Sequence, residues 1–174
     1  MDMIIAEIFP DTQLPYPIIF ARFCGAIFFG GLIGIEREVR ERPAGLRTHI
    51  LVSLAAAVFA IISIESIHVP GLSEEQVRID PLRVVEAVTA GVAFLAAGTI
   101  FMSRGQVHGV TTGAGLWLAG AIGLALGFGH WLIAAFALIA GLTVLVAVAR
   151  FEVSMQWKRE GEAASAPDTT SKPD

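Results

Sequence analysis

The sequence predicts an all-α protein, a polytopic helical bundle embedded in a membrane. Hydrophobic residues make up 55% of the 174 positions and charged residues only 16%, whereas soluble domains carry about 25% charged residues. The apolar residues also gather in five blocks, each close to the roughly 20 residues that a helix needs to cross a bilayer. Composition and block length together therefore favour five transmembrane helices over a soluble core.

Turn signals separate the five blocks. The first is apolar except for Arg22 and ends at a charged turn, and Pro70-Gly71 separates the second from the third. The segments 103–109 and 127–129 are glycine-containing turns. The predicted spans are 16–35, 46–66, 82–102, 111–128 and 130–149.

Arginine and lysine placement predicts the orientation of the bundle. The segments after the first, third and fifth spans carry most of the basic residues, whereas the opposite side has only Arg78 and Arg83. The positive-inside rule then places the N-terminus outside and the C-terminus in the cytoplasm. We expect an extracytoplasmic segment 1–15, a transmembrane domain 16–150 and a largely disordered cytoplasmic tail 151–174, because the tail is rich in Ala, Ser, Pro, Asp and Thr.

Small residues spaced at helical intervals predict close contacts between helices or with partner helices. The third-span set shares one helix face with Glu86, so we expect this carboxylate to point into the bundle. The predicted packing residues are Ala26, Gly30 and Gly34 in the first span, Ala90, Ala93 and Ala97 in the third, and Gly123 and Gly127 in the fourth.

Arg22 and Glu86 are the two ionisable residues predicted to lie at depth in the membrane, away from the ends of their spans. Both lie about one and a half turns from the same membrane surface, and an isolated charge in a bilayer costs several kcal/mol. We therefore expect the two side chains to form an ion pair. The pair is interpreted either as a structural lock between helices or as part of an ion or proton path.

The turn after the first span interleaves acidic and basic residues. Its arginines suit anionic lipid headgroups, each contributing on the order of 1 kcal/mol, but its glutamates exceed that need. The turn is therefore either a docking surface for a partner or a device that sets topology. The residues singled out for docking or lipid contact are Glu36, Arg37, Arg40, Arg42, Arg47 and Thr48.

The residue types also disfavour several classes of function. The net charge is −4, and no basic cluster is large enough for nucleic acid. The four histidines are distributed over both predicted membrane sides, and no serine or cysteine has a plausible base. The acidic stretch with Glu74, Glu75 and Asp80 is either a solvated charge run or a loose Mg²⁺ site. We expect a non-enzymatic protein without catalytic residues, a cofactor or a bound metal.

The motifs around the charged turn resemble the MgtC/SapB family. Residues 30–38 read Gly-Gly-Leu-Ile-Gly-Ile-Glu-Arg-Glu, and residues 42–54 read Arg-Pro-Ala-Gly-Leu-Arg-Thr-His-Ile-Leu-Val-Ser-Leu. The match continues with Asp-Pro-Leu-Arg-Val at 80–84 and with the glycine-rich segments 91–100 and 109–117. The resemblance covers about 22–149.

This resemblance implies a multi-pass protein of the bacterial inner membrane that is linked to growth at low magnesium and to survival inside host phagocytes, and so to virulence. It implies a regulator or adaptor of other membrane machines, including the F-type ATP synthase. Well-studied members carry a folded cytoplasmic domain after the last span, and the tail here is too short for one, so we expect a short form. Expected partners are the lipid bilayer, another membrane protein and a second copy in a homo-oligomer. The rival hypothesis is a Mg²⁺ or proton transporter or channel that uses Glu86.

Overall fold

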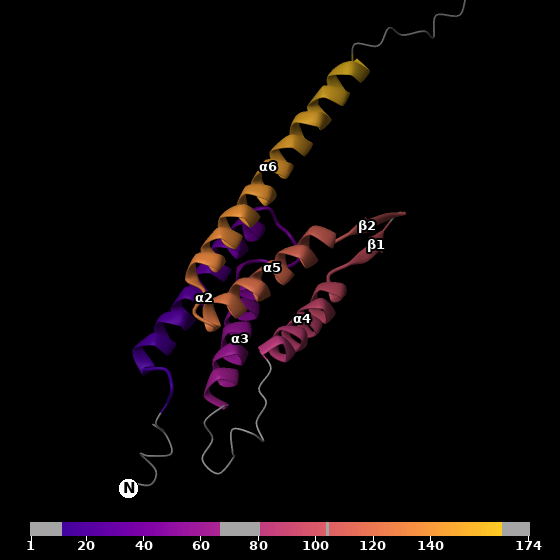
Figure 1. Ribbon diagram of the computed structural model, residues 1–174. Coiled ribbons are helices and arrows are strands. Elements are labelled where there is room, and N and C mark those ends of the chain that lie inside the picture. Colours follow the sequence, from indigo (N-terminus) through magenta and orange to yellow (C-terminus); the bar gives the residue numbers. More distant parts are fainter. Residues whose placement is uncertain (1–11, 67–80, 104, 165–174) are drawn as a thin grey trace, which may run out of the picture. The chain divides into compact units, whose positions relative to one another are not determined.

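The computed structural model describes residues 12–66, 81–103 and 105–164 (Figure 1). The chain divides into two compact units, Met1–Leu138 and Ile139–Asp174. The predicted acidic stretch with Glu74, Glu75 and Asp80 lies outside the described residues. The described elements are α2 (Tyr16–Val39), α3 (Leu46–Glu65), α4 (Pro81–Gly98), β1 (Phe101–Ser103), β2 (Gln106–His108), α5 (Val110–Gly127) and α6 (Trp131–Ala164).

The core of the first unit is built from α2, α3 and α5, which pack against one another. Glycines let the backbones approach closely: a Cβ at Gly34 would lie 2.7 Å from the Cα of Leu46, and one at Gly123 would lie 2.1 Å from the carbonyl oxygen of Ser53. The buried apolar side chains at this junction include Ile33, Ala56, Ala57, Ala60, Leu116, Ala119, Ile122 and Leu126.

Helix α4 packs on α5 and more sparsely on α3. Its buried face carries Val88, Val92 and Ala96. The predicted face differs, since Glu86, Ala90 and Ala97 are exposed within the single chain. The difference has a physical reason, because the larger valine side chains make more van der Waals contacts with the neighbouring helices than alanines do.

A short antiparallel hairpin joins α4 to α5, where the sequence predicts a continued helix and a turn. The pairs are Phe101 with His108, Met102 with Val107, and Ser103 with Gln106. Helix α4 ends at Gly98, before the end of its predicted span, and the Thr99 hydroxyl donates to the carbonyl oxygen of Ala96. Strands of three residues that are exposed on both faces leave no alternating pattern in the sequence.

Helix α6 is longer than its predicted span of 130–149. It runs from Trp131 to Ala164 and so includes part of the tail that was predicted to be largely disordered. The residues between 151 and 160 contain no proline or glycine and include several good helix formers, such as Met, Gln, Lys, Arg and Glu, which explains the continuation.

Three of the described helices are long and apolar enough to cross a membrane, namely α2, α3 and α5. Helix α6 contributes the shorter apolar stretch Trp131–Ala147. A helical membrane protein is therefore supported, whereas the five-span count and the orientation stay predictions.

Candidate functional site at the turn between α2 and α3

The charged turn is an ordered helix ending. The N–H of Arg42 donates to the carbonyl oxygen of Arg37 (3.1 Å), and the N–H of Glu41 donates to that of Glu38 (3.0 Å). Glu41 has a φ of 52°. This combination of bonds with a left-handed residue is a Schellman motif, which satisfies the last carbonyl groups of a helix. The turn therefore holds a defined backbone conformation.

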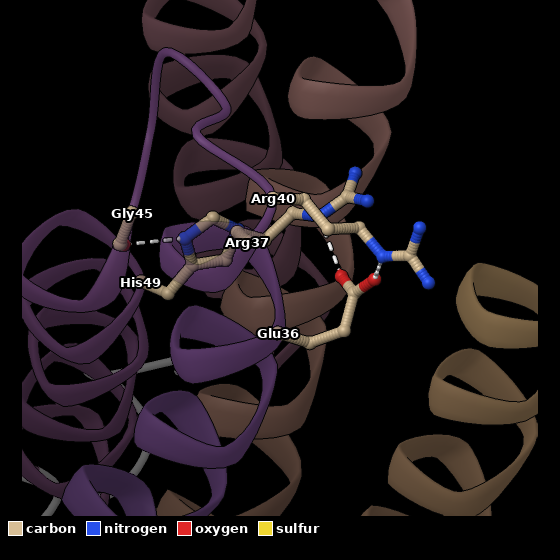
Figure 2. A network of polar contacts seen from close by, with 5 residues as sticks. All are labelled: Glu36, Arg37, Arg40, Gly45 and His49. Atoms are coloured by element: carbon tan, nitrogen blue, oxygen red, sulfur yellow. Dashed lines mark hydrogen bonds and ion pairs between the residues drawn. The ribbon is translucent and has the colours of Figure 1, made fainter. Parts of the chain in front are cut away.

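Glu36 organises two arginines beneath this turn. Its Oε2 accepts a hydrogen bond from the Nε of Arg37 (2.8 Å). Its Oε1 forms an ion pair with Arg40, one helical turn further on (Figure 2). The Arg37 side chain is only 2% exposed and that of Glu36 12%. A guanidinium this deeply buried depends on its carboxylate, because removing one partner of a buried ion pair leaves an uncompensated charge.

Glu38 connects the turn to the next helix. Its Oε2 accepts a hydrogen bond from the backbone N–H of Leu46 (3.0 Å), the first residue of α3. A carboxylate at a helix N-terminus satisfies an unpaired donor and interacts favourably with the helix dipole. Gly45 makes the approach possible, since a Cβ there would lie 1.7 Å from Glu38 Oε2.

His49 lies one turn into α3 and is completely buried. Its Nδ1 lies 2.8 Å from the carbonyl oxygen of Gly45 (Figure 2). A carbonyl oxygen only accepts, so the neutral ring carries its proton on Nδ1 and presents Nε2 as an acceptor. Nε2 faces α5, where a Cβ at Gly115 would lie 3.1 Å from it and 3.8 Å from the Cδ of Arg37. The cluster thus joins α2, α3 and α5.

Besides Glu36 Oε1, which forms an ion pair with Arg40, three buried polar atoms of this region have no hydrogen-bond partner among the described residues. They are Arg37 Nη1, His49 Nε2 and Ser53 Oγ. Ser53 follows His49 by one turn on the same face of α3. Such atoms cost free energy when left unpaired, so the site retains capacity for further hydrogen bonds.

The structure separates the predicted docking residues into two groups. Glu36 and Arg37 lie beneath the turn and hold it, so Arg37 is not the lipid-facing or partner-facing residue that the sequence suggests. The residues that remain accessible are Arg40, Arg42, Arg47 and Thr48.

Arg22 and Glu86 are not brought together. The Nη1 of Arg22 donates to the carbonyl oxygen of Gly127 (2.6 Å), at the end of α5. Gly129 makes room for the guanidinium, since it has a φ of 84° and its Cβ would lie 2.7 Å from Arg22 Nη2. Glu86 is exposed on α4, which packs on α5 and α3. Arg22 therefore donates to the carbonyl oxygen of Gly127 instead of pairing with the predicted carboxylate, and its buried Nε has no hydrogen-bond partner among the described residues.

Replacing Arg22 with glutamine is expected to lower the free energy of unfolding by about 1.5 kcal/mol, because a charged hydrogen bond to the Gly127 carbonyl is lost. Combining it with Glu86→Gln should be additive to within about 0.5 kcal/mol, as for sites without shared partners. Unfolding in mixed micelles with rising dodecyl sulfate fraction measures both. A coupling energy of about 1 kcal/mol or more between Arg22→Gln and Glu86→Gln would show that the predicted ion pair forms.

Sequence reasoning missed two further contacts. His49 is one of four histidines scattered along the sequence, and its place four residues after Gly45, in the first turn of α3, is the local signal for its contact with the Gly45 carbonyl. Glu65 ends α3 and accepts hydrogen bonds from the backbone N–H groups of Gln13 (2.8 Å) and Leu14 (3.1 Å). It thereby ties the segment before α2 to α3, and no local pattern in the sequence signals a contact across some fifty residues.

The fold and the site together define a small helical membrane protein whose polar contacts concentrate at one helix turn. Residues 23–154 match the MgtC family, and the chain belongs to that family. The matched region contains the whole turn with Glu36, Arg37 and His49, so the organised cluster is part of the family domain.

Curated relatives agree with this assignment. The chain is 43% identical over 109 residues to the protein MgtC of Brucella abortus, covering 63% of this chain and 42% of that protein. It is 37% identical over 115 residues (66% and 53%) to YhiD of Escherichia coli K12, whose name describes a candidate magnesium transporter. It is 35% identical over 117 residues (66% and 50%) to SapB of Bacillus subtilis.

The chain spans about half the length of these relatives. No solved structure matches it.

Proposed function

We propose that this chain is a non-enzymatic, multi-pass protein of the bacterial inner membrane that regulates other membrane machinery in magnesium homeostasis. Five spans, an outside N-terminus and a cytoplasmic C-terminus are part of the proposal, as is the link to intracellular survival that the resemblance implies. The magnesium-related name of the Escherichia coli relative supports the physiological context.

One observation carries the regulatory role. The turn between α2 and α3 is held by the Glu36–Arg37 ion pair and by the hydrogen bond from Leu46 to Glu38, while Arg42 and Arg47 are exposed and Arg40, although paired with Glu36, remains partly exposed. A docking surface gains affinity when its charged groups are preorganised, because less entropy is lost on binding. Anchoring of this kind exceeds what a topology signal needs, so we favour partner docking.

The position of Glu86 supports regulation more than transport. Its side chain is exposed within the single chain, on a helix that packs on α5 and α3. The observation that still favours transport is the group of unpaired buried atoms on Arg37, His49 and Ser53, which could hold water inside the bundle. Transport therefore remains the competing function for the following experiment.

Reconstitution of the purified chain alone into liposomes separates the two functions. A regulator is expected to give no Mg²⁺ or proton flux above protein-free vesicles, with circular dichroism confirming the helical fold. Flux that is lost in Ser53→Ala, with the fold intact, would establish transport through the bundle and overturn the regulatory role.

Neutralising the accessible arginines is expected to weaken docking. We predict that Arg40→Gln, Arg42→Gln and Arg47→Gln together reduce partner binding about tenfold, because each exposed charge contributes about 0.5 kcal/mol. The measurement is co-purification with the F-type ATP synthase, the partner that the family resemblance implies. Arg150→Gln, an exposed arginine elsewhere, is the matched control and should leave the yield unchanged.

The outcome that contradicts this prediction is equal recovery of the partner with the triple variant and with Arg150→Gln. In that case the turn serves topology or lipid contact instead of docking.

A further inference from the structure

An elongated apolar groove lies between α3 and α4, with a volume of about 640 Å³. One stripe of each helix lines it, at intervals of three and four residues: α3 contributes positions from Val52 to Ser66, and α4 positions from Arg83 to Leu95. The stretch from Val52 to Ser66 rises about 21 Å along the helix. The groove therefore follows the helices lengthwise.

The lining of the groove is apolar along most of its length and polar at one end. Most of its residues are alanine, valine, leucine, isoleucine, phenylalanine or glycine, and the polar ones, Ser63, Ser66 and Arg83, gather at the end where α3 stops and α4 begins. Arg83 is exposed in the first turn of α4. A ligand that complements the groove has an apolar tail and an anionic group at one end.

The length of the groove suits an acyl chain. One leaflet of the hydrocarbon core is only about 15 Å thick, so the groove is long enough for an extended lipid tail. The headgroup phosphate would then lie at the interface beside Arg83.

We propose that this groove is a binding site for one membrane phospholipid, with an acyl chain between α3 and α4 and the phosphate on Arg83. The proposal does not depend on the regulatory function. Gly91 lines the groove and provides a direct test, because a Cβ there would meet nothing within 4 Å. A larger side chain at this position would occupy the space of the lipid tail without displacing the protein.

The test titrates the delipidated full-length chain in detergent with dioleoyl phosphatidylglycerol or with dioleoylglycerol, which lacks the phosphate. Native mass spectrometry measures the bound lipid. Gly91→Leu should weaken phosphatidylglycerol binding about tenfold, because the leucine takes the place of several buried methylene groups. Gly98→Leu is the matched control, since Gly98 also has open space on α4 but does not line the groove.

Arg83→Gln tests the headgroup. It should weaken phosphatidylglycerol binding about fivefold and leave dioleoylglycerol binding unchanged, as expected for one lost phosphate contact at the surface. Arg150→Gln, which changes an exposed arginine that does not line the groove, is the control and should bind both lipids normally.

Three results would overturn the proposal. Equal phosphatidylglycerol binding by the native chain, Gly91→Leu and Gly98→Leu would show that the groove holds no lipid. Loss of self-association in Gly91→Leu with unchanged lipid binding would show that a second copy fills it. Equal losses for both lipids in Arg83→Gln would place the phosphate elsewhere.

Discussion

Replacing Glu36 with glutamine is expected to lower the free energy of unfolding by about 3 kcal/mol, the lower end of the range for removing one partner of a buried ion pair. The cause is Arg37, whose side chain is 2% exposed and whose Nε pairs with Glu36 at 2.8 Å. Glutamine retains the shape and one acceptor but not the charge. Dodecyl sulfate unfolding in mixed micelles, followed by circular dichroism, measures the loss.

Two further variants show whether the buried charge is responsible. Adding Arg37→Met to Glu36→Gln removes the unpaired cation, so the double variant should be more stable than Glu36→Gln alone. Arg42→Gln changes an exposed arginine of the same turn and should stay within about 0.5 kcal/mol of the native chain. If Glu36→Gln and Arg42→Gln unfold alike, Glu36 does not stabilise Arg37.

The second large effect is expected at the contact between α3 and α5. A Cβ at Gly123 would lie 2.1 Å from the carbonyl oxygen of Ser53 and 2.8 Å from its Cα. These are backbone atoms, which cannot rotate away as a side chain can, so Gly123→Ala must push the two helices apart. We expect a loss of about 3 kcal/mol, at the upper end for overpacking, in the same unfolding assay.

Gly98→Ala is the matched control for Gly123→Ala. Both positions lie in helices, but a Cβ at Gly98 would meet nothing within 4 Å. Alanine is the better helix former, but Gly98 is the last residue of α4, so Gly98→Ala should leave the stability unchanged or raise it by at most about 0.5 kcal/mol. A similar gain for Gly123→Ala would mean that the close helix contact is not maintained in the folded protein.

Some elements of the fold could be predicted from the sequence and others could not. The bounds of α3 agree with the predicted span 46–66 to within one residue, because Gly45 and the charged turn mark its start clearly. The hairpin between α4 and α5 could not be predicted, since its exposed three-residue strands show no periodicity. The buried face of α4 was predicted on alanines, but Val88 and Val92 offer more apolar area to the bundle.

The partners of the charged side chains could not be predicted from the sequence either. Residues 36 and 37 are adjacent and of opposite charge, and nothing in their order states that Arg37 is buried while Arg40 remains partly exposed. Arg22 and Glu86 share a predicted depth, yet depth does not determine direction around a helix axis. Arg22 donates to the carbonyl oxygen of Gly127, and a backbone acceptor cannot be predicted from the charges of side chains.

The sequence by itself determined that this is a helical membrane protein of the MgtC family, because block hydropathy and a local motif are properties of contiguous residues. Only the tertiary structure decided which charges are partners. Glu36 with Arg37, His49 against Gly115 and Arg22 on Gly127 depend on how helices rotate and cross. That rotation is set by the packing of glycines and valines from three or four helices at once, which no single segment contains.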